Sequence, residues 1–564
     1  YTEIKLELGP ATAKLQDKFT YTFDKNDCGV AIMEIDENGE MVSAGLLKGN
    51  SFETKYRIRI VATKSGDVEF RVKGDSTAFS NGVVLHVPKS IRTAAELNAI
   101  RNDTEGYYIL EDDIDISCYP EWKPIGYYEK DDRTSANTFK GYFDGNGHVV
   151  SGMRINVEFE NNAAVGFFGV IDTTAIVKNF TLTDYMITGK YENGGYGEWL
   201  GGLAGVVYGK VSDCKVAGGY IDVGGKVARY IGGAVGELGG SFVSENGKIE
   251  ASAVVIVNAD ADTTVSEYAI GGAVGRFESG ELSPISMTES VVKVIGKAGL
   301  FSVGGLLGST NASIKNSSIG RAEIFVSNAV SVKVGGAVGN ASGCNLSEIR
   351  VEGSVRVNAG SEVYIGGVAG IASSIKNASF VGVIDSDLDD ASAYVGGVAG
   401  SSGAVTGGAF AGEMIFLDEN GKICANSLKT GFISGALGGD AKDNFVYANG
   451  GSVPESVLAF VRGGDYSEKR TNYGGSVKLS SDGSIGFGGI AATVNGNLDG
   501  YDFKYDSFDI SAEKGVTAGG LAASVYVVSN SSVEIDAYSV SSGSGKVKVG
   551  SVAATARSVI DCVV

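Results

Sequence analysis

The sequence predicts an all-β protein, most of which is a parallel β-helix built from similar stacked coils. A six-residue tract of the form apolar-Gly-Gly-apolar-apolar-Gly recurs along the chain. Successive tracts lie about 31 residues apart over most of the chain, a period that is typical of stacked repeats. Glycine is abundant, with 84 of 564 residues, whereas proline occurs 6 times. With 43% apolar residues, this composition favours short strands joined by tight turns over a disordered chain.

Each tract is expected to mark the same corner of one coil, because paired glycines allow neighbouring segments to approach closely. The copies are LGGLAG at 200–205, IGGAVG at 231–236 and 270–275, VGGLLG at 303–308, VGGAVG at 334–339, IGGVAG at 365–370, VGGVAG at 395–400 and ISGALG at 433–438. A shorter form, VGFFG, stands at 165–169, and copies that end in Ala stand at 487–492, 518–523 and 549–554. The long steps at 236–275 and 438–492 are expected to carry projecting loops. The second step is also expected to contain one degenerate coil, because Arg462-Gly463-Gly464 lies close to where its tract would fall.

A turn-type residue recurs after many of the tracts and predicts a second corner in each coil. These residues are Asn179, Asp213, Asn316, Asn377, Asn530 and Asp561. Asn and Asp tolerate the left-handed backbone conformation of a sharp corner. Cys214 and Cys562 occupy nearly the same repeat position as Ser317 and Ser531, which predicts small side chains and free buried thiols inside the coils. A β-prism or propeller is the alternative architecture, and the unequal steps disfavour it.

Residues 1–88 lack the tract and instead alternate polar with apolar residues, as in KYRIRIV at 55–61. A period of two predicts strands with one buried face, and DENG at 36–39 predicts a hairpin turn. We therefore expect an immunoglobulin-like β-sandwich over 1–88 and the β-helix over 89–564, with its N-terminal cap and first coils at 89–152. Thr93 and Glu96 form a capping-box pattern, and the helix that follows is expected to cover the end of the array.

Charge and cysteine content exclude several kinds of partner. The formal net charge is −20, and an acidic surface repels nucleic acid. No run of about 18 apolar residues is present, so no membrane-inserted segment is predicted. The six cysteines are far apart and the chain has only two histidines, so neither a metal nor another cofactor is expected. We expect a monomer.

Four segments resemble the opening of GLUG-repeat proteins: IRTAAEL at 91–97, YILEDDID at 108–115, WKPIG at 122–126 and FKGYFDGNGH at 139–148. The GGxxG tracts resemble the motif that names this family, and the resemblance covers about residues 89–564. In the family, the repeats occur in secreted or surface-anchored bacterial proteins that are often adhesin-like. The resemblance implies a right-handed β-helix at the cell surface, and it brings no catalytic residues. The N-terminal sandwich resembles small domains of surface lipoproteins from gut Bacteroidetes, so an outer-membrane lipoprotein is one form the protein can take.

The chain carries no recognisable catalytic motif. HExxH, GxSxG and a P-loop are absent, and His148 lies in a turn motif where a structural role is expected. Two acidic clusters are the candidates for a calcium or carboxylate site, although a solvated loop is the favoured interpretation for them. They are Asp112, Asp113 and Asp115, and then Asp385, Asp387, Asp389 and Asp390.

Aromatic residues give the candidate binding site. Tyr191, Tyr196 and Trp199 belong to a glycine-rich segment that is expected to be exposed, and exposed rings are docking points for sugars and proteins. Trp122 and Tyr108 are expected instead to pack the N-terminal cap.

We therefore expect an exported, adhesin-like surface protein without catalytic activity that binds a glycan or a surface protein of the host or environment. The alternative is a polysaccharide lyase or glycosidase on the same β-helix, which predicts two neighbouring carboxylates in a groove under the loops at 236–275 or 438–492.

Overall fold

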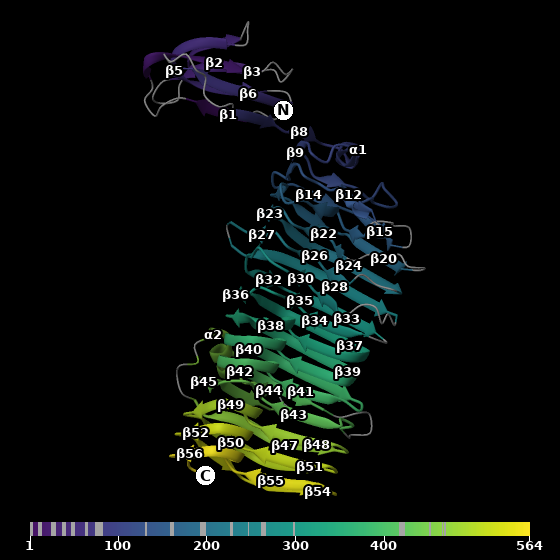
Figure 1. Ribbon diagram of the computed structural model, residues 1–564, viewed down its shortest axis with the longest axis vertical. Helices are drawn as coiled ribbons and strands as arrows, with labels where there is room; N and C mark the ends of the chain where they lie inside the picture. Colours follow the sequence, from purple (N-terminus) through teal and green to yellow (C-terminus); the bar gives the residue numbers. More distant parts are fainter. Residues whose placement is uncertain are drawn as a thin grey trace. The chain divides into compact units, whose positions relative to one another are not determined.

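The computed structural model describes residues 4–8, 14–23, 30–35, 41–46, 51–62, 66–73, 83–129, 132–157, 163–191, 199–225, 229–245, 247–260, 267–296, 299–416, 423–449, 453–464, 466 and 470–564. The protein is all-β, with 4% helix and 67% strand, and it contains a parallel β-solenoid of about 13 turns. The predicted fold class is therefore confirmed, and the prism and propeller alternatives are wrong because consecutive coils pair in parallel along one stack (Figure 1).

The chain forms two compact units. The first comprises Tyr1–Asp115, Lys140–Val150 and Thr174–Phe180, and the second comprises Ile116–Phe139, Ser151–Thr173 and Thr181–Val564. The predicted boundary at residue 88 lies inside the first unit.

The first unit begins with a seven-stranded antiparallel arrangement in the order β4-β3-β5-β2-β6-β7, with β1 also paired to β5. Its strands are β1 (Ile4–Leu8), β2 (Lys14–Phe23), β3 (Val30–Ile35), β4 (Met41–Leu46), β5 (Ser51–Ala62), β6 (Gly66–Lys73) and β7 (Val83–Val87). The predicted turn at 36–39 lies outside the described residues, but the strands on either side of it, β3 and β4, are antiparallel partners. The immunoglobulin-like type stays a prediction.

The capping-box prediction is confirmed at α1 (Ala94–Ala99), which continues into η1 (Ile100–Asn102). The backbone N–H of Glu96 donates to Thr93 Oγ1 over 3.2 Å, and the N–H of Thr93 donates to Glu96 Oε2 over 3.1 Å. The N–H of Arg92 also donates to the Glu96 carboxylate and holds its pKa below the usual value. Beside the helix runs a parallel stack of β8 (Lys89–Ile91), β9 (Tyr107–Leu110), β13 (Tyr142–Asp144) and β18 (Ile176–Lys178).

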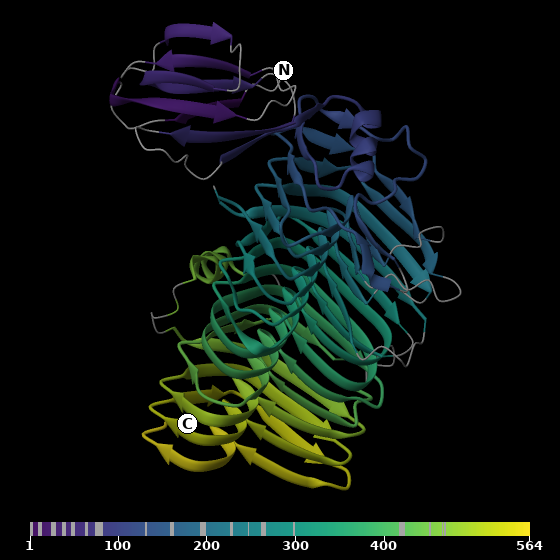
Figure 2. The ribbon, with the colours of Figure 1, turned by 45° about the horizontal axis from the view of Figure 1, so that its top comes forward.

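The second unit contains three long parallel ladders of strands together with shorter ones, and Figure 2 shows the coils stacked on one another. The first ladder contains β16 (Ala164–Val165), β21 (Trp199–Gly201), β25 (Tyr230–Gly232), β29 (Tyr268–Gly271), β34 (Leu300–Gly304), β37 (Ser318–Gly335), β39 (Arg350–Gly366), β41 (Ser392–Gly396), β43 (Ser427–Gly431), β48 (Ser484–Gly488), β51 (Gly515–Gly519) and β55 (Lys546–Gly550).

The second ladder contains β17 (Phe168–Ile171), β22 (Ala204–Val207), β26 (Val235–Leu238), β30 (Val274–Phe277), β35 (Leu307–Thr310), β38 (Val338–Ser347), β40 (Ala369–Leu388), β42 (Ala399–Ile415), β44 (Ser434–Leu437), β49 (Ala491–Asp499), β52 (Ala522–Ser529) and β56 (Ala553–Ile560). Each glycine tract joins a strand of the first ladder to a strand of the second, so it stands at a corner of the coil.

The third ladder contains β15 (Arg154–Asn156), β20 (Met186–Tyr191), β24 (Lys215–Gly225), β28 (Ile249–Ala259), β33 (Ser290–Gly296), parts of β37, β39, β40 and β42, and then β46 (Phe445–Ala448), β47 (Asn472–Ser481), β50 (Asp502–Ala512) and β54 (Tyr538–Ser542). The remaining strands are β10 (Ile114–Asp115), β11 (Tyr127–Glu129), β12 (Asp132–Asn137), β14 (Val149–Ser151), β19 (Thr181–Thr183), β23 (Lys210–Ser212), β27 (Ser241–Val243), β31 (Glu281–Leu282), β32 (Ile285–Met287), β36 (Ile314–Lys315), β45 (Ala441–Lys442) and β53 (Ser532–Ile535).

The first glycine of the tract is held in place by the backbone of the next coil. Strand register aligns this position from Gly201 to Gly550, and Gly occupies every coil. A Cβ on Gly431 would lie 2.5 Å from the Cα of Ala491 and 2.7 Å from the carbonyl oxygens of Gly488 and Ile490. The expected close approach at paired glycines is thus confirmed.

The same register corrects one tract. Gly396 pairs with Gly431, and Ala399 pairs with Ser434, so the repeat in this coil is TGFISG at 430–435 and not ISGALG at 433–438. The error arose because Phe432 replaces the second glycine, and the pattern then fits better three residues later.

The predicted second corner is confirmed by the backbone. Asn179, Asp213, Asn316, Asn377, Asn530 and Asp561 have φ angles of 56°, 51°, 51°, 52°, 48° and 49°. The coil between Asn316 and Asn377 uses Glu348 instead, with φ of 56°, which the turn-residue pattern missed. Two of these amides also bond between coils, because Asn179 Nδ2 donates to Asp144 Oδ1 and Asn530 Nδ2 donates to Asp499 Oδ1.

The repeat equivalence of Cys and Ser is visible in their hydrogen bonds. Each side chain donates to the carbonyl oxygen two residues earlier: Cys214 Sγ (3.3 Å), Ser317 Oγ (3.1 Å), Ser531 Oγ (2.7 Å) and Cys562 Sγ (3.3 Å). Cys214 is buried as predicted, whereas Cys562 is partly exposed. Burial of Cys562 was therefore a wrong expectation, because the coil that contains it is the last of the stack.

The interior is a column of apolar side chains shared by successive coils. Phe380 and Phe410 are register partners, and their rings stack 6.3 Å apart. Phe410 stacks in turn on Phe432, 6.2 Å away, with an interplanar angle of 7°. Trp122 and Tyr108 are buried as predicted, in the second and first unit respectively.

An insertion between β46 and β47 contains α2 (Glu455–Gly463). The predicted degenerate coil at 462–464 is wrong, because these residues end the helix, and Gly464 closes it with a left-handed φ of 73°. The helix packs on the outer side of β40 and β42 in a cluster that includes Val461 and Tyr466. Arg462 pairs with both carboxylate oxygens of Glu352, at 2.8 and 2.9 Å. The described helices include none long and apolar enough for a membrane span.

Candidate functional site

A groove follows the glycine corner over four successive coils. Its walls are β43, β48, β51 and β55 on one side and β49 and β52 on the other, and its volume is about 510 Å³. We call it the tract groove. Its described lining consists of Ser427, Lys429, Ser484, Ile485, Gly486, Ala492, Thr493, Lys514, Gly515, Thr517, Ala523, Ser524 and Lys546.

The tract groove is basic, although the whole chain carries a net charge of −20. Three lysines and five hydroxyl side chains belong to the described lining, and none of the lining residues there is Asp or Glu. Strand register brings the lysines together. Lys546 pairs with Gly515, which directly follows Lys514 in the chain. The same column continues through Ser484 to Ser427, two residues before Lys429. Positive charge in a concave surface raises the local concentration of anions.

A pair of tyrosines continues the same column beyond Lys429. Tyr364 and Tyr394 are register partners whose rings stack 4.9 Å apart at 8°. Lys429 Nζ lies 4.8 Å from the ring centroid of Tyr394 and donates to its hydroxyl over 3.3 Å. The two rings therefore cover each other on one side, and Lys429, which lines the groove, lies over the other face of Tyr394.

The Tyr364 hydroxyl stays protonated over the physiological range, because its pKa is raised above the usual value. Burial raises the pKa of Tyr364, and its hydroxyl donates to Glu362 Oε1 over 2.7 Å, which raises the pKa further. A neutral hydroxyl both donates and accepts hydrogen bonds. Together with the serine and threonine hydroxyls and the lysines, this surface suits an extended ligand that is polar and negatively charged.

The N-terminal part of the same column is filled by its own side chains. Register aligns Trp199 with Tyr230, and both are only 4% exposed. Trp199 Nε1 donates to Glu237 Oε2 over 3.1 Å, and burial raises the pKa of Glu237. Val206 packs in the same cluster.

The expected exposure of the aromatic segment is therefore wrong for two of its three residues. Trp199 is buried in that cluster, and Tyr191, at the end of β20, is 3% exposed. Tyr196 lies outside the described residues. The cause is the parallel stack, which places Trp199 in a strand beside Tyr230 and not in a loop. A ligand-binding role for these residues stays a prediction, and burial gives it no support.

Sequence reasoning missed the lysines of the groove and the tyrosines of the adjoining column. Tyr364, Tyr394 and Lys429 each stand directly before the first residue of a tract, as Trp199 does. Aligning all tracts and reading that single position along the chain finds the column.

The acidic clusters are involved in local contacts. Asp113 accepts hydrogen bonds from the N–H of Val149 and from His148, which lower the pKa of its carboxyl. Asp387 accepts from Asn358 Nδ2 over 2.8 Å, and Asp385 lies 3.8 Å from Arg356 Nε. Within the described ranges, no three or more His, Cys, Asp or Glu residues are grouped to hold a metal ion.

Two curated proteins share sequence with parts of the chain. One is named a putative Gly-rich membrane protein, from Evansella cellulosilytica, and is 36% identical over 152 residues, which are 26% of this chain and 16% of that protein. The other is halomucin of Haloquadratum walsbyi, 28% identical over 188 residues, or 32% of this chain and 2% of halomucin. The chain thus spans less than a fifth of either relative. No protein-family model and no solved structure matches. The chain is similar in sequence to segments of these two much longer proteins.

Proposed function

We propose that this protein is an exported, adhesin-like solenoid of the cell surface that binds acidic glycans of a host or of its environment in the tract groove, without catalysing a reaction. The observation that carries the proposal is the groove itself, with three lysines and no carboxylate in its described lining.

Support for the location comes from the relatives and from the repeats. The Evansella relative is named a membrane protein, and the GGxxG tracts resemble the GLUG repeats of bacterial surface proteins. A β-solenoid suits such a site because each coil packs only on its neighbours, so a long rod is stable without a large globular core.

Support for the ligand comes from the spacing of the groove. Neighbouring coils lie about 4.8 Å apart, and the groove crosses four of them, so its polar groups recur along a line. A polysaccharide offers equivalent groups at regular intervals and gains affinity from several weak contacts. Carboxylate or sulfate groups on the sugar would pair with Lys429, Lys514 and Lys546.

The proposal is tested by titrating the full chain with three polysaccharides: heparin, alginate and uncharged dextran. Binding of heparin or alginate that weakens with added salt is expected, because salt screens exposed charge pairs. Each exposed pair contributes up to about 1 kcal/mol, so replacing the three lysines with Gln should weaken binding about tenfold to hundredfold.

The matched control is Lys376→Gln, which removes an exposed lysine of β40 whose register partner is Thr406, in a part of the coil away from the tract. Equal loss of binding in this control, or unchanged binding in the triple variant, contradicts the proposal. New reducing or unsaturated sugar ends during the incubation would reveal catalysis and overturn the non-catalytic part.

A further inference from the structure

The third ladder has a strand position that no described strand fills beyond Ala448. Above it, β42 pairs through Glu413, Met414 and Ile415 with β40. Below it, Ser476–Ser480 of β47 pair with β50. The strand that belongs between them, β46, ends at Ala448, where it pairs with Gly412. Beyond this point, the described residues place no strand between β42 and β47. Only Ile423 pairs with this edge of β47, at its C-terminal end, where the Ile423 N–H donates to Ser480 O over 3.0 Å.

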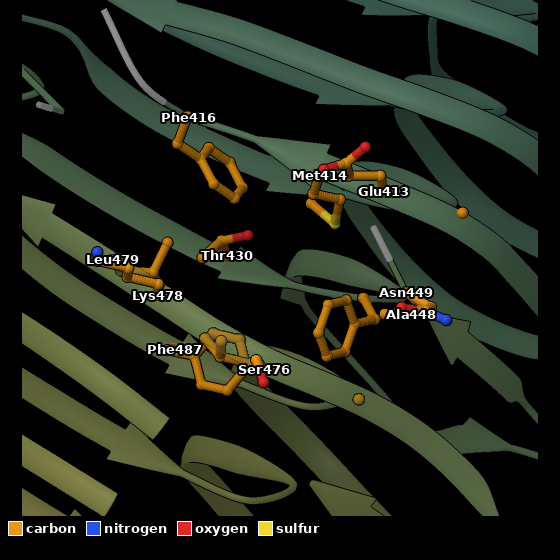
Figure 3. A pocket seen from close by; sticks show the side chains of 14 residues that line it. Glu413, Met414, Phe416, Thr430, Ala448, Asn449, Ser476, Lys478, Leu479 and Phe487 are labelled. Atoms are coloured by element: carbon orange, nitrogen blue, oxygen red, sulfur yellow. The ribbon is translucent and has the colours of Figure 1, made fainter. Parts of the chain in front are cut away.

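A pocket of about 190 Å³ occupies this position, which we call the wall slot. Figure 3 shows Met414 and Phe416 on one side of the open space and Leu479 and Phe487 across from them. Because strands pair at about 4.8 Å, one missing strand separates β42 from β47 by roughly 10 Å.

The side chains of the wall slot alternate as they do in a paired sheet. Val477 and Leu479 are buried, whereas Ser476 and Lys478 are exposed. Met414 is the register partner of the fully buried Ile384. The inner side of the slot is therefore apolar, and its outer side is polar.

The insertion is what keeps the slot open. After Asn449 the chain leaves the ladder to form α2, and it returns at Asn472, where β47 pairs with β46 only through Tyr473 and Tyr447. The helix is fixed to the wall by the Arg462–Glu352 pair and by the buried Val461. Before α2, the described chain therefore forms only the first half of this ladder strand, as β46.

We propose that the wall slot binds one extended peptide strand of a partner protein, added in parallel between β42 and β47. The occupant must be a strand, because both facing edges are β-strands and each presents backbone donors and acceptors at strand spacing. Every second side chain of the peptide must be a small apolar residue such as Val, since these side chains enter the interior above Phe432 and Phe487. The outward positions lie between Glu413 and Lys478 and accept polar residues.

The probe is the blocked peptide GSVRVNA, which copies residues 353–359 of β39, the strand two positions before β42 in this ladder. Labelled with a fluorophore, it is titrated with the full chain and followed by anisotropy. Saturable binding is expected. The same peptide N-methylated at both valines should bind at least tenfold more weakly, because the methyl groups remove backbone donors.

Two variants of the protein locate the site. Met414→Trp fills the slot and should weaken peptide binding at least tenfold, whereas Ser480→Trp, on the exposed face of β47 outside the pocket lining, should leave it within twofold. Circular dichroism melting checks that both variants fold. If Met414→Trp does not fold, hydrogen exchange of the wild-type chain locates the bound peptide instead. The amides of 413–415 and 476–480 should then gain protection when the peptide is added.

Three results would overturn the proposal. They are no saturable binding to the folded wild-type chain, equal binding of the N-methylated peptide, and protection that appears elsewhere in the chain. A wild-type dimer that the peptide dissociates would assign the slot to a second copy of this chain and would likewise overturn a separate partner. None of these results depends on glycan binding in the tract groove.

Discussion

Replacing Gly431 with Ala tests whether the glycine corner is required by close contact between coils. The added Cβ would lie 2.5 Å from Ala491 Cα and 2.7 Å from the carbonyl oxygens of Gly488 and Ile490. All three atoms belong to the backbone of the next coil, which is hydrogen bonded on both sides and cannot rotate away as a side chain can. Overpacking of this kind costs 1–3 kcal/mol or somewhat more, and we expect about 3 kcal/mol here because only the backbone can move.

The matched control is Gly486→Ala in the same ladder of the next coil. Its added Cβ meets atoms only at 3.6 Å or farther, which is ordinary contact. Here the lower entropy of the unfolded chain should stabilise the protein by about 0.4–1 kcal/mol.

Urea unfolding followed by circular dichroism compares the midpoints of the two variants with that of the wild type, and hydrogen exchange locates the damage. Because a solenoid need not unfold in one step, exchange should increase first in the strands around Gly431. A Gly431→Ala midpoint equal to the wild-type value, or an equally large loss for Gly486→Ala, would refute the argument from close contact.

Three further outcomes are expected. Asn316→Ala should lower stability by about 1–2 kcal/mol, because a residue with a φ of 51° loses its tolerance for the left-handed region, and Asn316→Gly should restore most of it in the same urea assay. Val461→Asp should release α2, seen as faster proteolysis at 453–464 with a nearly unchanged urea midpoint of the ladder. Burial raises the pKa of Glu237 above its usual value, so the folded state keeps this proton to higher pH than the unfolded state, and stability falls as the pH rises through the window between the two pKa values. Glu237→Gln should remove this part of the pH dependence and keep an acceptor for Trp199; an unchanged pH profile would contradict it.

The coil architecture was accessible from the sequence because its determinants are local and repeated. Both corners have a steric cause that restricts the residue type: the tract needs an absent Cβ at Gly431, and the second corner needs tolerance of positive φ at Asn316. Where one of these determinants is replaced, prediction fails. Phe432 displaced the tract by three residues, and Glu348 concealed one corner.

The candidate sites were less accessible because they depend on register between coils. Tyr364, Tyr394 and Lys429 are about 30 residues apart in the chain and become neighbours only when the strands pair. The same stacking turned Trp199, which looks like part of a loop, into a buried strand residue. The wall slot has no sequence signature, since it arises where β46 ends early and the described chain continues into α2.

The ion pair of Arg462 and Glu352 joins residues 110 positions apart and bears on how the rod unravels. Most other described contacts of a coil are with its immediate neighbours, although Asn340–Glu267 and Lys514–Asn426 join coils two apart. Pulling on the C-terminal end should therefore peel the coils away one after another. The helix α2 belongs to a later coil, but it packs on β40 and β42. Peeling must pause there until the helix detaches, so this contact should raise the force needed to unfold the coils from that end.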